Sequence, residues 1–134
     1  MGKPSFDLGE NEIELGIGVH GEPGVKRVPM MLADDIVDVL LDAVVKDLKL
    51  ERGEDVLLYI NGLGATPLSE QYIMFNHAHD RLDALGINVT RRQVGNFFTS
   101  LEMQGASLTL MRLDEELTTL YDAPVHTAGW RAGM

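Results

Sequence analysis

The feature that most constrains the fold is an apolar run that leads directly into a turn and then into a helix start. Val56–Ile60 is a continuous apolar run, which is typical of a strand that is covered on both faces. Asn61–Ala65 contains two glycines and predicts a turn. Thr66 and Pro67 then predict the cap and the first position of a helix. A strand followed so closely by a helix favours an α/β fold.

Helical spacing predicts two long helices and a short third one. Apolar residues recur at helical spacing between Ile36 and Leu48, and acidic residues near the start of this segment suit the helix dipole. The helix that begins near Pro67 is expected to end before Gly86, and Asp114 is expected to cap the short final helix. The apolar side of the second helix is expected to consist of Leu68, Tyr72, Phe75 and Leu82.

Strand patterns alternate with these helices. Besides Val56–Ile60, we expect strands at Glu12–Val19, Ile87–Val94 and Leu108–Leu113. The resulting order is β-α-β-α-β-β-α, which indicates an α/β fold with a mixed or mostly parallel sheet covered by helices. No internal repeat or long linker divides the sequence, so residues 1–134 are expected to form a single domain.

The composition excludes several classes of function. Eleven basic and twenty-one acidic residues give a net charge of −10, so we expect no nucleic-acid partner and no membrane partner, since both need clustered Lys and Arg. The absence of cysteine excludes disulfides, cysteine–metal sites and thiol catalysis. No apolar run approaches the roughly eighteen residues of a membrane span, and no signal-peptide pattern opens the chain. We therefore expect a cytoplasmic protein.

His20 is the strongest candidate for a functional residue. It comes directly after the apolar run that ends at Val19 and directly before the turn-rich segment Gly21–Gly24, a position where α/β proteins often hold chemistry. Gly16 and Gly18 share one side of the expected strand, which indicates a close approach to its backbone. A neutral imidazole can act as a nucleophile or a base. The alternative is a loop histidine that hydrogen-bonds the turn.

The other candidate motifs favour structural roles. Asn61–Thr66 lies between a strand and a helix, where backbone amides could cradle a phosphate, but it lacks both the dinucleotide fingerprint and the Lys-Ser/Thr of a P-loop. We interpret it as a structural turn. His77 and His79 point to different helix faces and make a poor metal pair, so no metal site is predicted and solvent-exposed or capping roles are expected. His126 is expected to be structural. Solvated helix faces are expected for Asp34, Asp35, Asp38, Glu115 and Glu116.

Four ordered blocks of the sequence resemble one family. The string Glu-Leu-Gly-Ile-Gly-Val-His-Gly-Glu-Pro-Gly at residues 14–24 is similar to the motif around the substrate-binding histidine of the dihydroxyacetone (glycerone) kinase K subunit. Val56–Leu68, Gly95–Met103 and Asp122–His126 resemble later blocks of the same family in the same order. The resemblance extends over nearly the whole chain and corresponds to the C-terminal half of that subunit, the substrate-binding DhaK domain.

The resemblance implies an unusual covalent chemistry. The histidine that matches His20 adds through a ring nitrogen to the C2 carbonyl of the substrate and forms a hemiaminal, so dihydroxyacetone or another short keto-sugar is accepted and glycerol is refused. Because glycine carries no side chain, Gly16, Gly18 and Gly21 would let the backbone come near the substrate. Anchoring of this kind orients the terminal hydroxyl for phosphoryl transfer.

The resemblance also implies partners. The N-terminal half of the K subunit would supply the general base, and a separate nucleotide-binding L subunit or domain would hold ATP or ADP with Mg. No cofactor is expected in this chain, a homodimer is allowed, and the isolated chain is expected to be inactive as a kinase. The alternative is a non-catalytic relative that senses dihydroxyacetone or assembles with partners. A third possibility is a stable truncated domain without activity of its own.

Overall fold

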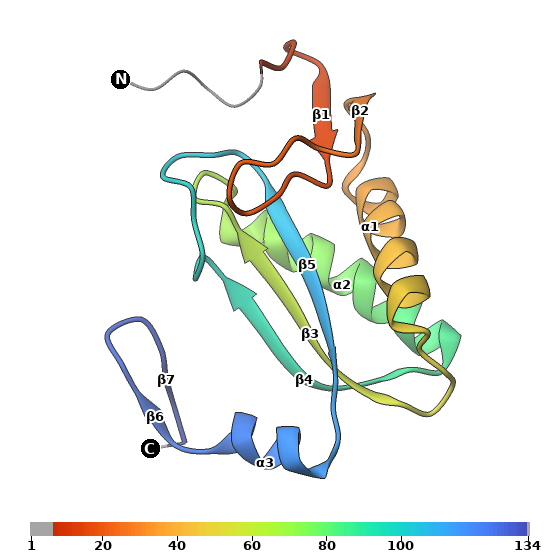
Figure 1. Ribbon diagram of the computed structural model, residues 1–134, viewed down its shortest axis with the longest axis vertical. Helices are drawn as coiled ribbons and strands as arrows, with labels where there is room; N and C mark the ends of the chain where they lie inside the picture. Colours follow the sequence, from red (N-terminus) through yellow and green to blue (C-terminus); the bar gives the residue numbers. More distant parts are fainter. Residues whose placement is uncertain (1–6, 134) are drawn as a thin grey trace. The chain divides into compact units, whose positions relative to one another are not determined.

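The computed structural model describes residues 7–133. These residues form two compact units (Figure 1). The first unit extends to Leu32, and the second begins at Ala33. The single domain expected for residues 1–134 stays a prediction, and each unit is described by itself below.

The first unit is an antiparallel hairpin. Its strands are β1 (Glu12–Leu15) and β2 (Lys26–Pro29), and Ile13 lies opposite Val28. The strand expected to extend to Val19 was predicted too long, because Gly16 has a φ of +72° and takes the chain out of extended geometry. The sequence analysis also missed β2, which is only four residues long and mostly polar. These corrections place the segment 16–25 in a loop between two strands.

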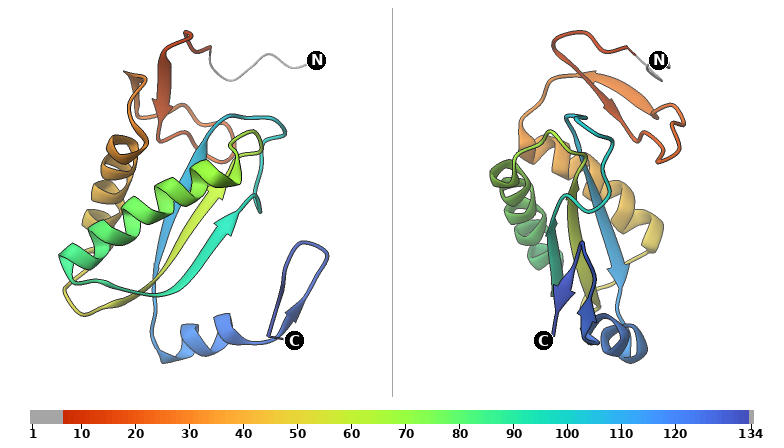
Figure 2. Two further views of the ribbon diagram at one scale, coloured as in Figure 1. Left: turned by 180° about the vertical axis from the view of Figure 1, so that it is seen from behind. Right: turned by 90° about the vertical axis from the view of Figure 1, so that its left-hand side faces the viewer.

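The second unit is built on a mixed three-stranded sheet with the order β4-β3-β5. The central strand β3 (Asp55–Gly62) pairs in parallel with β4 (Asn88–Gly95) and antiparallel with β5 (Ala106–Arg112). The helix α2 (Leu68–Leu85) packs against β3 and β4, and α1 (Ala33–Leu48) packs against α2 and β5 (Figure 2). The predicted α/β class with a mixed sheet and helices is therefore confirmed.

A short C-terminal segment follows the sheet. Helix α3 (Glu115–Asp122) begins at the predicted cap, because the Asp114 side chain accepts a hydrogen bond from Leu117 N at 2.8 Å. The hairpin of β6 (Val125–His126) and β7 (Arg131–Ala132) was not predicted, since two-residue strands leave no periodic pattern. Arg91 of β4 pairs with Asp122 at the end of α3. In the described part of the chain, no helix combines the length and the apolar character that crossing a membrane requires.

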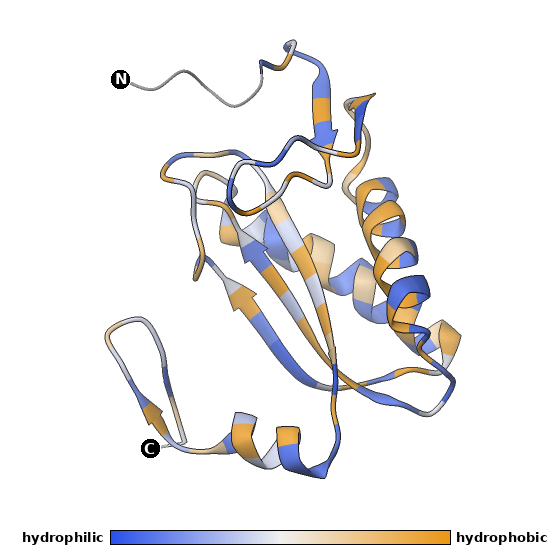
Figure 3. Ribbon diagram, in the orientation of Figure 1, coloured by the Kyte–Doolittle hydropathy of each residue, from blue (hydrophilic) through white to orange (hydrophobic). Residues whose placement is uncertain are grey.

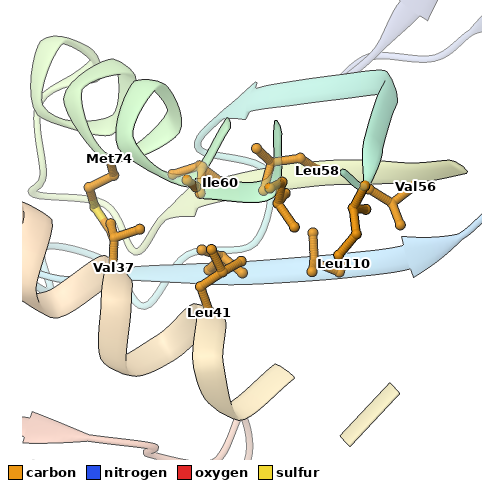
Figure 4. Packing of buried hydrophobic residues seen from close by; sticks show 11 residues of the cluster. Val37, Leu41, Val56, Leu58, Ile60, Met74 and Leu110 are labelled. Carbon is orange, nitrogen blue, oxygen red and sulfur yellow. The ribbon is translucent and has the colours of Figure 1, made fainter. Parts of the chain in front are cut away.

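The hydrophobic core lies between β3 and the two long helices (Figure 4). Alternate residues of β3 contribute to it, as the two-residue period of a strand requires, and Leu110 lies opposite Leu58 in the sheet register. Figure 3 shows the contrast with β4, whose central residues are hydrophilic. Full burial of one such aliphatic side chain contributes about 1.5–3 kcal/mol. The buried cluster consists of Val37, Leu41, Val56, Leu58, Ile60, Met74, Ala78, Leu82, Ile87, Leu108 and Leu110.

The start and the inner face of α2 differ from the expectation. Thr66 does not cap the helix; its hydroxyl bonds to the backbone N and O of Gly105, both at 2.8 Å, and Pro67 takes the cap position. The expected face is also wrong in part, because Tyr72 is 54% exposed, Leu68 is exposed and only Leu82 of that set is fully buried. The predicted end is confirmed by Gly86, which closes the helix with a φ of +74°. The inner face of α2 is formed by Gln71, Met74, Ala78 and Leu82.

Polar side chains join α1 to α2. Asp38 of α1 lies 2.8 Å from His77 Nε2 and accepts a hydrogen bond from Arg81 Nη1, also at 2.8 Å. The sequence analysis placed Asp38 on a solvated face and His77 in an exposed or capping role. The structure corrects both, because the two helices lie side by side and bring these half-buried groups together.

Asn61 fastens the end of β3 to the loop that follows β4. Its side chain is 2% exposed, and its Oδ1 accepts hydrogen bonds from the backbone N of Phe97 and of Phe98, both at 2.9 Å. Its Nδ2 donates to Phe98 O at 2.7 Å, and Tyr59 donates its hydroxyl hydrogen to the same Oδ1. One buried amide therefore satisfies several backbone groups that would otherwise lack partners.

We predict that Asn61→Ala destabilises the chain by about 2–4 kcal/mol, because it removes the three hydrogen bonds that join the buried Asn61 amide to the backbone of Phe97 and Phe98. Urea unfolding measures the loss. Asn76→Ala is the matched control, since Asn76 is exposed and has only a 3.4 Å contact with Asp80; it should stay within about 0.5 kcal/mol of the parent chain. Equal stability of the two variants would contradict this role of Asn61.

Candidate functional site

His20 lies in the loop between β1 and β2. The predicted position at a strand end is shifted, because β1 ends at Leu15 and the loop closes where Val25 N donates to Leu15 O at 2.8 Å. The His20 side chain is 88% exposed. An imidazole with this exposure is accessible to a small molecule. The surrounding loop fixes the backbone conformation of His20 and its nearest contacts.

Two backbone hydrogen bonds close a small ring around His20. Gly18 N donates to Glu22 O at 3.1 Å, and Gly21 N donates to Gly18 O, also at 3.1 Å. Gly21 has a φ of +90°, a conformation that favours glycine. His20 therefore stands at the tip of a tight turn over residues 18–22.

The carboxylate of Glu22 folds back onto this turn. Its Oε2 accepts a hydrogen bond from His20 N at 3.0 Å, and its Oε1 lies 3.4 Å from His20 Nδ1. The backbone N–H groups of Glu22 itself and of His20 lower the pKa of this carboxyl below its ordinary value of 4.5, with a smaller contribution from the His20 side chain. The imidazole thus has an ionised carboxylate as a direct neighbour at neutral pH.

The glycines of the loop make room for its own side chains. A Cβ on Gly18 would lie 2.0 Å from Glu22 Oε2, so only glycine lets the carboxylate reach this place. A Cβ on Gly16 would lie 2.9 Å from Val25 Cγ2, and Gly16 also has a positive φ. The expected role of Gly16, Gly18 and Gly21 in letting a substrate approach stays a prediction. The contacts with Val25 and Glu22 show a second reason for glycine at positions 16 and 18, because a larger residue would collide with the loop's own side chains.

Glu22 is the residue that sequence reasoning missed. It was assigned only to the turn, because a glutamate between glycine and proline gives no periodic or motif signal of its own. A carboxylate two residues after a candidate histidine is the signal that points to it, since Asp and Glu are frequent partners of functional imidazoles. Its placement depends on turn closure, which the sequence alone does not specify.

The turn at Asn61–Thr66 is structural, as predicted. Leu63 N donates to Gly105 O and Ala65 N donates to Met103 O, both at 3.0 Å. Gly64 lies so close to the 96–103 segment that a Cβ would stand 1.9 Å from Leu101 O. These amides already have backbone partners, so they are not free to cradle a phosphate.

The other histidines lie apart from His20 in the sequence and have separate surroundings. His77 contacts Asp38 and Asp34, His79 lies 3.7 Å from Asp80, and His126 belongs to β6. Among residues 7–133, no group of three or more His, Asp or Glu side chains is arranged to hold a metal ion.

Comparisons with known proteins show the family to which this chain belongs. A family model described as the Dak1 domain matches residues 1–129. The chain is 44% identical over 131 residues to the dihydroxyacetone-binding subunit DhaK of PTS-dependent dihydroxyacetone kinase 1 from Listeria innocua. That match covers 97% of this chain and 40% of the relative, so the chain spans well under half of the relative's length.

Solved structures share the fold. The dihydroxyacetone kinase operon co-activator Dha-DhaQ matches with a TM-score of 0.83 and 32% identity, over 91% of this chain and 38% of its own. The dihydroxyacetone kinase from C. freundii, solved with AMP-PNP and Mg²⁺, matches with a TM-score of 0.73 and 25% identity, over 94% of this chain and 23% of its own. One fold therefore occurs both in a kinase and in a protein named as an operon co-activator.

We predict that the Glu22 carboxyl titrates below 4.5 and that the His20 amide signal follows the same transition. Because the folded pKa is lowered, the Glu22 contribution to the turn is present above the ordinary pKa and is lost as the pH falls through the lowered one. Carbon-detected NMR of the carboxyl group measures the midpoint.

Gly18→Ala provides the control, since its Cβ would displace the carboxylate and return the midpoint toward 4.5. A midpoint at or above 4.5 in the parent chain would disprove the carboxylate geometry.

Proposed function

Because the chain belongs to the Dak1 domain family, we propose that it is the substrate-anchoring part of a dihydroxyacetone (glycerone) kinase and that His20 binds the substrate covalently. The observation that carries the proposal is the exposed His20 imidazole beside the Glu22 carboxylate, in a chain 44% identical to a dihydroxyacetone-binding subunit. The C-terminal half of the K subunit remains the proposed place of this chain within such a protein.

The proposed step is the addition of a neutral imidazole to a ketone. A ring nitrogen of His20 donates its lone pair to C2 of dihydroxyacetone, and the carbon–oxygen π bond breaks. The carbonyl oxygen takes up a proton, and the other ring nitrogen gives up its proton, so the product is a neutral hemiaminal with no change in oxidation state. The exposed ring of His20 gives a small ketone unobstructed access to its nitrogens.

With this chemistry, the chain selects its substrate by whether the molecule carries a reactive carbonyl group. Glycerol has no carbonyl carbon to accept the lone pair and cannot form the adduct, although its size and hydroxyl groups are similar. A pocket that discriminates by fit alone gains little from such small polar differences. The bond also holds the terminal hydroxyl in a fixed place, which is the main requirement for phosphoryl transfer.

The complete reaction needs groups from outside this chain. A general base and most of the hydrogen-bonding shell around the sugar would come from the N-terminal half of the K subunit. ATP or ADP with Mg would belong to a separate L subunit or domain, and the Leu63 and Ala65 amides of the turn already have backbone partners. A cytoplasmic location and a homodimer are compatible with this assignment.

A regulatory role is the second candidate. The match to the Dha-DhaQ co-activator, at a TM-score of 0.83, favours it, as does a match of the same TM-score to a structure titled for regulation of the dha operon of Lactococcus lactis. A sensor of this kind would bind dihydroxyacetone at the same histidine and would not pass it to a phosphoryl donor.

We predict that dihydroxyacetone labelled with ¹³C at C2 forms an adduct with this chain. The carbonyl signal should convert into that of a tetrahedral carbon coupled to a ring nitrogen of His20. His20→Ala should abolish the signal, and glycerol should give no adduct with the parent chain. NMR of the ¹⁵N-histidine-labelled chain measures the coupling.

His79→Gln is the matched control, since His79 is a partly exposed histidine of the same chain and should leave the adduct unchanged. An adduct that persists in His20→Ala would contradict the proposal. The same holds if no adduct forms in the parent chain at saturating dihydroxyacetone.

We predict that the purified chain does not phosphorylate dihydroxyacetone with ATP and Mg²⁺, because the proposal places the general base and the nucleotide site in other parts of the kinase. Adding the N-terminal half of a related K subunit together with its L subunit should restore turnover, and His20→Ala should prevent this. A coupled ADP assay measures the rate. Turnover by the chain alone at about 1–100 s⁻¹, the range of ordinary kinases, would refute this division of labour.

A further inference from the structure

The carboxylate of Glu22 is held in place by the backbone of the turn. Its Oε2 accepts the His20 N–H at 3.0 Å, and the backbone N–H groups of Glu22 itself and of His20 lower the pKa of the carboxyl. Gly18 leaves the only room for it, since a Cβ there would lie 2.0 Å from Oε2. The position of the carboxylate is therefore determined mainly by the backbone of the turn, and the imidazole ring makes a smaller contribution.

The second oxygen of this carboxylate faces one particular ring nitrogen. Glu22 Oε1 lies 3.4 Å from His20 Nδ1. The arginine of the hairpin is engaged elsewhere, because Arg27 lies 3.0 Å from Glu14 and 4.0 Å from Glu12. The ionised Glu22 carboxylate is thus the charged group that the structure places beside the His20 ring.

An ionised carboxylate can only accept hydrogen bonds, so the nitrogen that faces it is favoured as the N–H nitrogen. In neutral histidine one ring nitrogen carries the proton and the other carries the lone pair. A free imidazole favours the proton on Nε2, so a carboxylate beside Nδ1 would reverse the ordinary preference.

We propose that Glu22 is a positioning residue that holds His20 in the Nδ1–H tautomer and leaves the lone pair on Nε2, which faces away from the carboxylate. The inference rests on the proposed function for its purpose, because the lone pair on Nε2 is what would add to the ketone. Glu22 itself does not touch the substrate.

The same contact assists the electronic change during addition. When Nε2 forms its bond to C2, the ring becomes cationic until the Nδ1 proton leaves. Glu22 Oε1 lies beside that proton and either stabilises the charge or accepts the proton for transfer to solvent. The carbonyl oxygen gains a proton from water in the same step, so charge and atoms balance.

The test determines which ring nitrogen of His20 carries the proton, without any ligand. The chain labelled with ¹⁵N in its histidines is measured by NMR at about pH 8.5, which is above the range in which free imidazole takes up a proton. Each ring nitrogen then shows whether it carries hydrogen or a lone pair. We expect His20 to be mostly Nδ1–H.

Four variants separate the carboxylate from other causes. Glu22→Ala should convert His20 to mostly Nε2–H and leave the three other histidines unchanged. Gly18→Ala should have the same effect with the charge retained, because its Cβ displaces the carboxylate. Glu22→Asp should keep part of the Nδ1–H preference. Glu10→Ala removes a carboxylate from the same unit outside the turn and should change nothing at His20.

The hairpin amide signals report whether each variant keeps its fold, and Glu22→Ala suffices if Gly18→Ala unfolds the turn. A His20 that is mostly Nε2–H in the parent chain, or unchanged in Glu22→Ala, overturns the proposal. The two proposals fail separately. An Nδ1–H His20 that forms no adduct with dihydroxyacetone contradicts only the proposed function. An adduct at His20 with an unaltered tautomer in Glu22→Ala contradicts only the role of Glu22.

Discussion

The burial of one face of β3 is the constraint on which the second unit depends. Val56, Leu58 and Ile60 are fully buried, and each strand neighbour and each long helix contributes side chains to the same cluster. Because β3 is paired on both sides, its backbone groups have partners in the sheet and its apolar side chains can leave water. At the end of β3, the Asn61 side chain makes hydrogen bonds to the backbone of Phe97 and Phe98 and so connects the strand to the loop that follows β4.

The loop of His20 is organised by a different kind of interaction. Few apolar contacts are available to an exposed ten-residue segment, and its order comes from backbone hydrogen bonds and from one carboxylate that folds onto Gly18. The imidazole lies outside this network except for its contact with Glu22. The His20 backbone is therefore fixed by a hydrogen bond, whereas its ring is exposed to solvent. Such a side chain suits a ligand that forms a bond, because the bond supplies the affinity that a deep pocket would otherwise provide.

The sequence predicted those parts of the fold that leave local signals. The apolar run at Val56–Ile60, Gly86 after the second helix and Asp114 before the third each identified an element correctly. The helix face around Tyr72 was wrong, because Gln71 and Ala78 lie inside: Gln71 bonds to Thr66 O and Asn96, and the small Ala78 fits the packed interface. The short strands β2, β6 and β7 have too few residues for a periodic pattern. His20 was predicted from its motif, and its role stays a prediction; the contact of Glu22 with it depends on three-dimensional turn closure.

The central proposal is that His20 binds dihydroxyacetone covalently and that Glu22 orients its ring. A crystal structure of this chain grown with dihydroxyacetone tests it most directly. The account predicts continuous electron density from Nε2 of His20 to a tetrahedral C2, on the side of the ring away from Glu22. Dihydroxyacetone bound elsewhere with a free His20, or a bond formed through Nδ1, would contradict it.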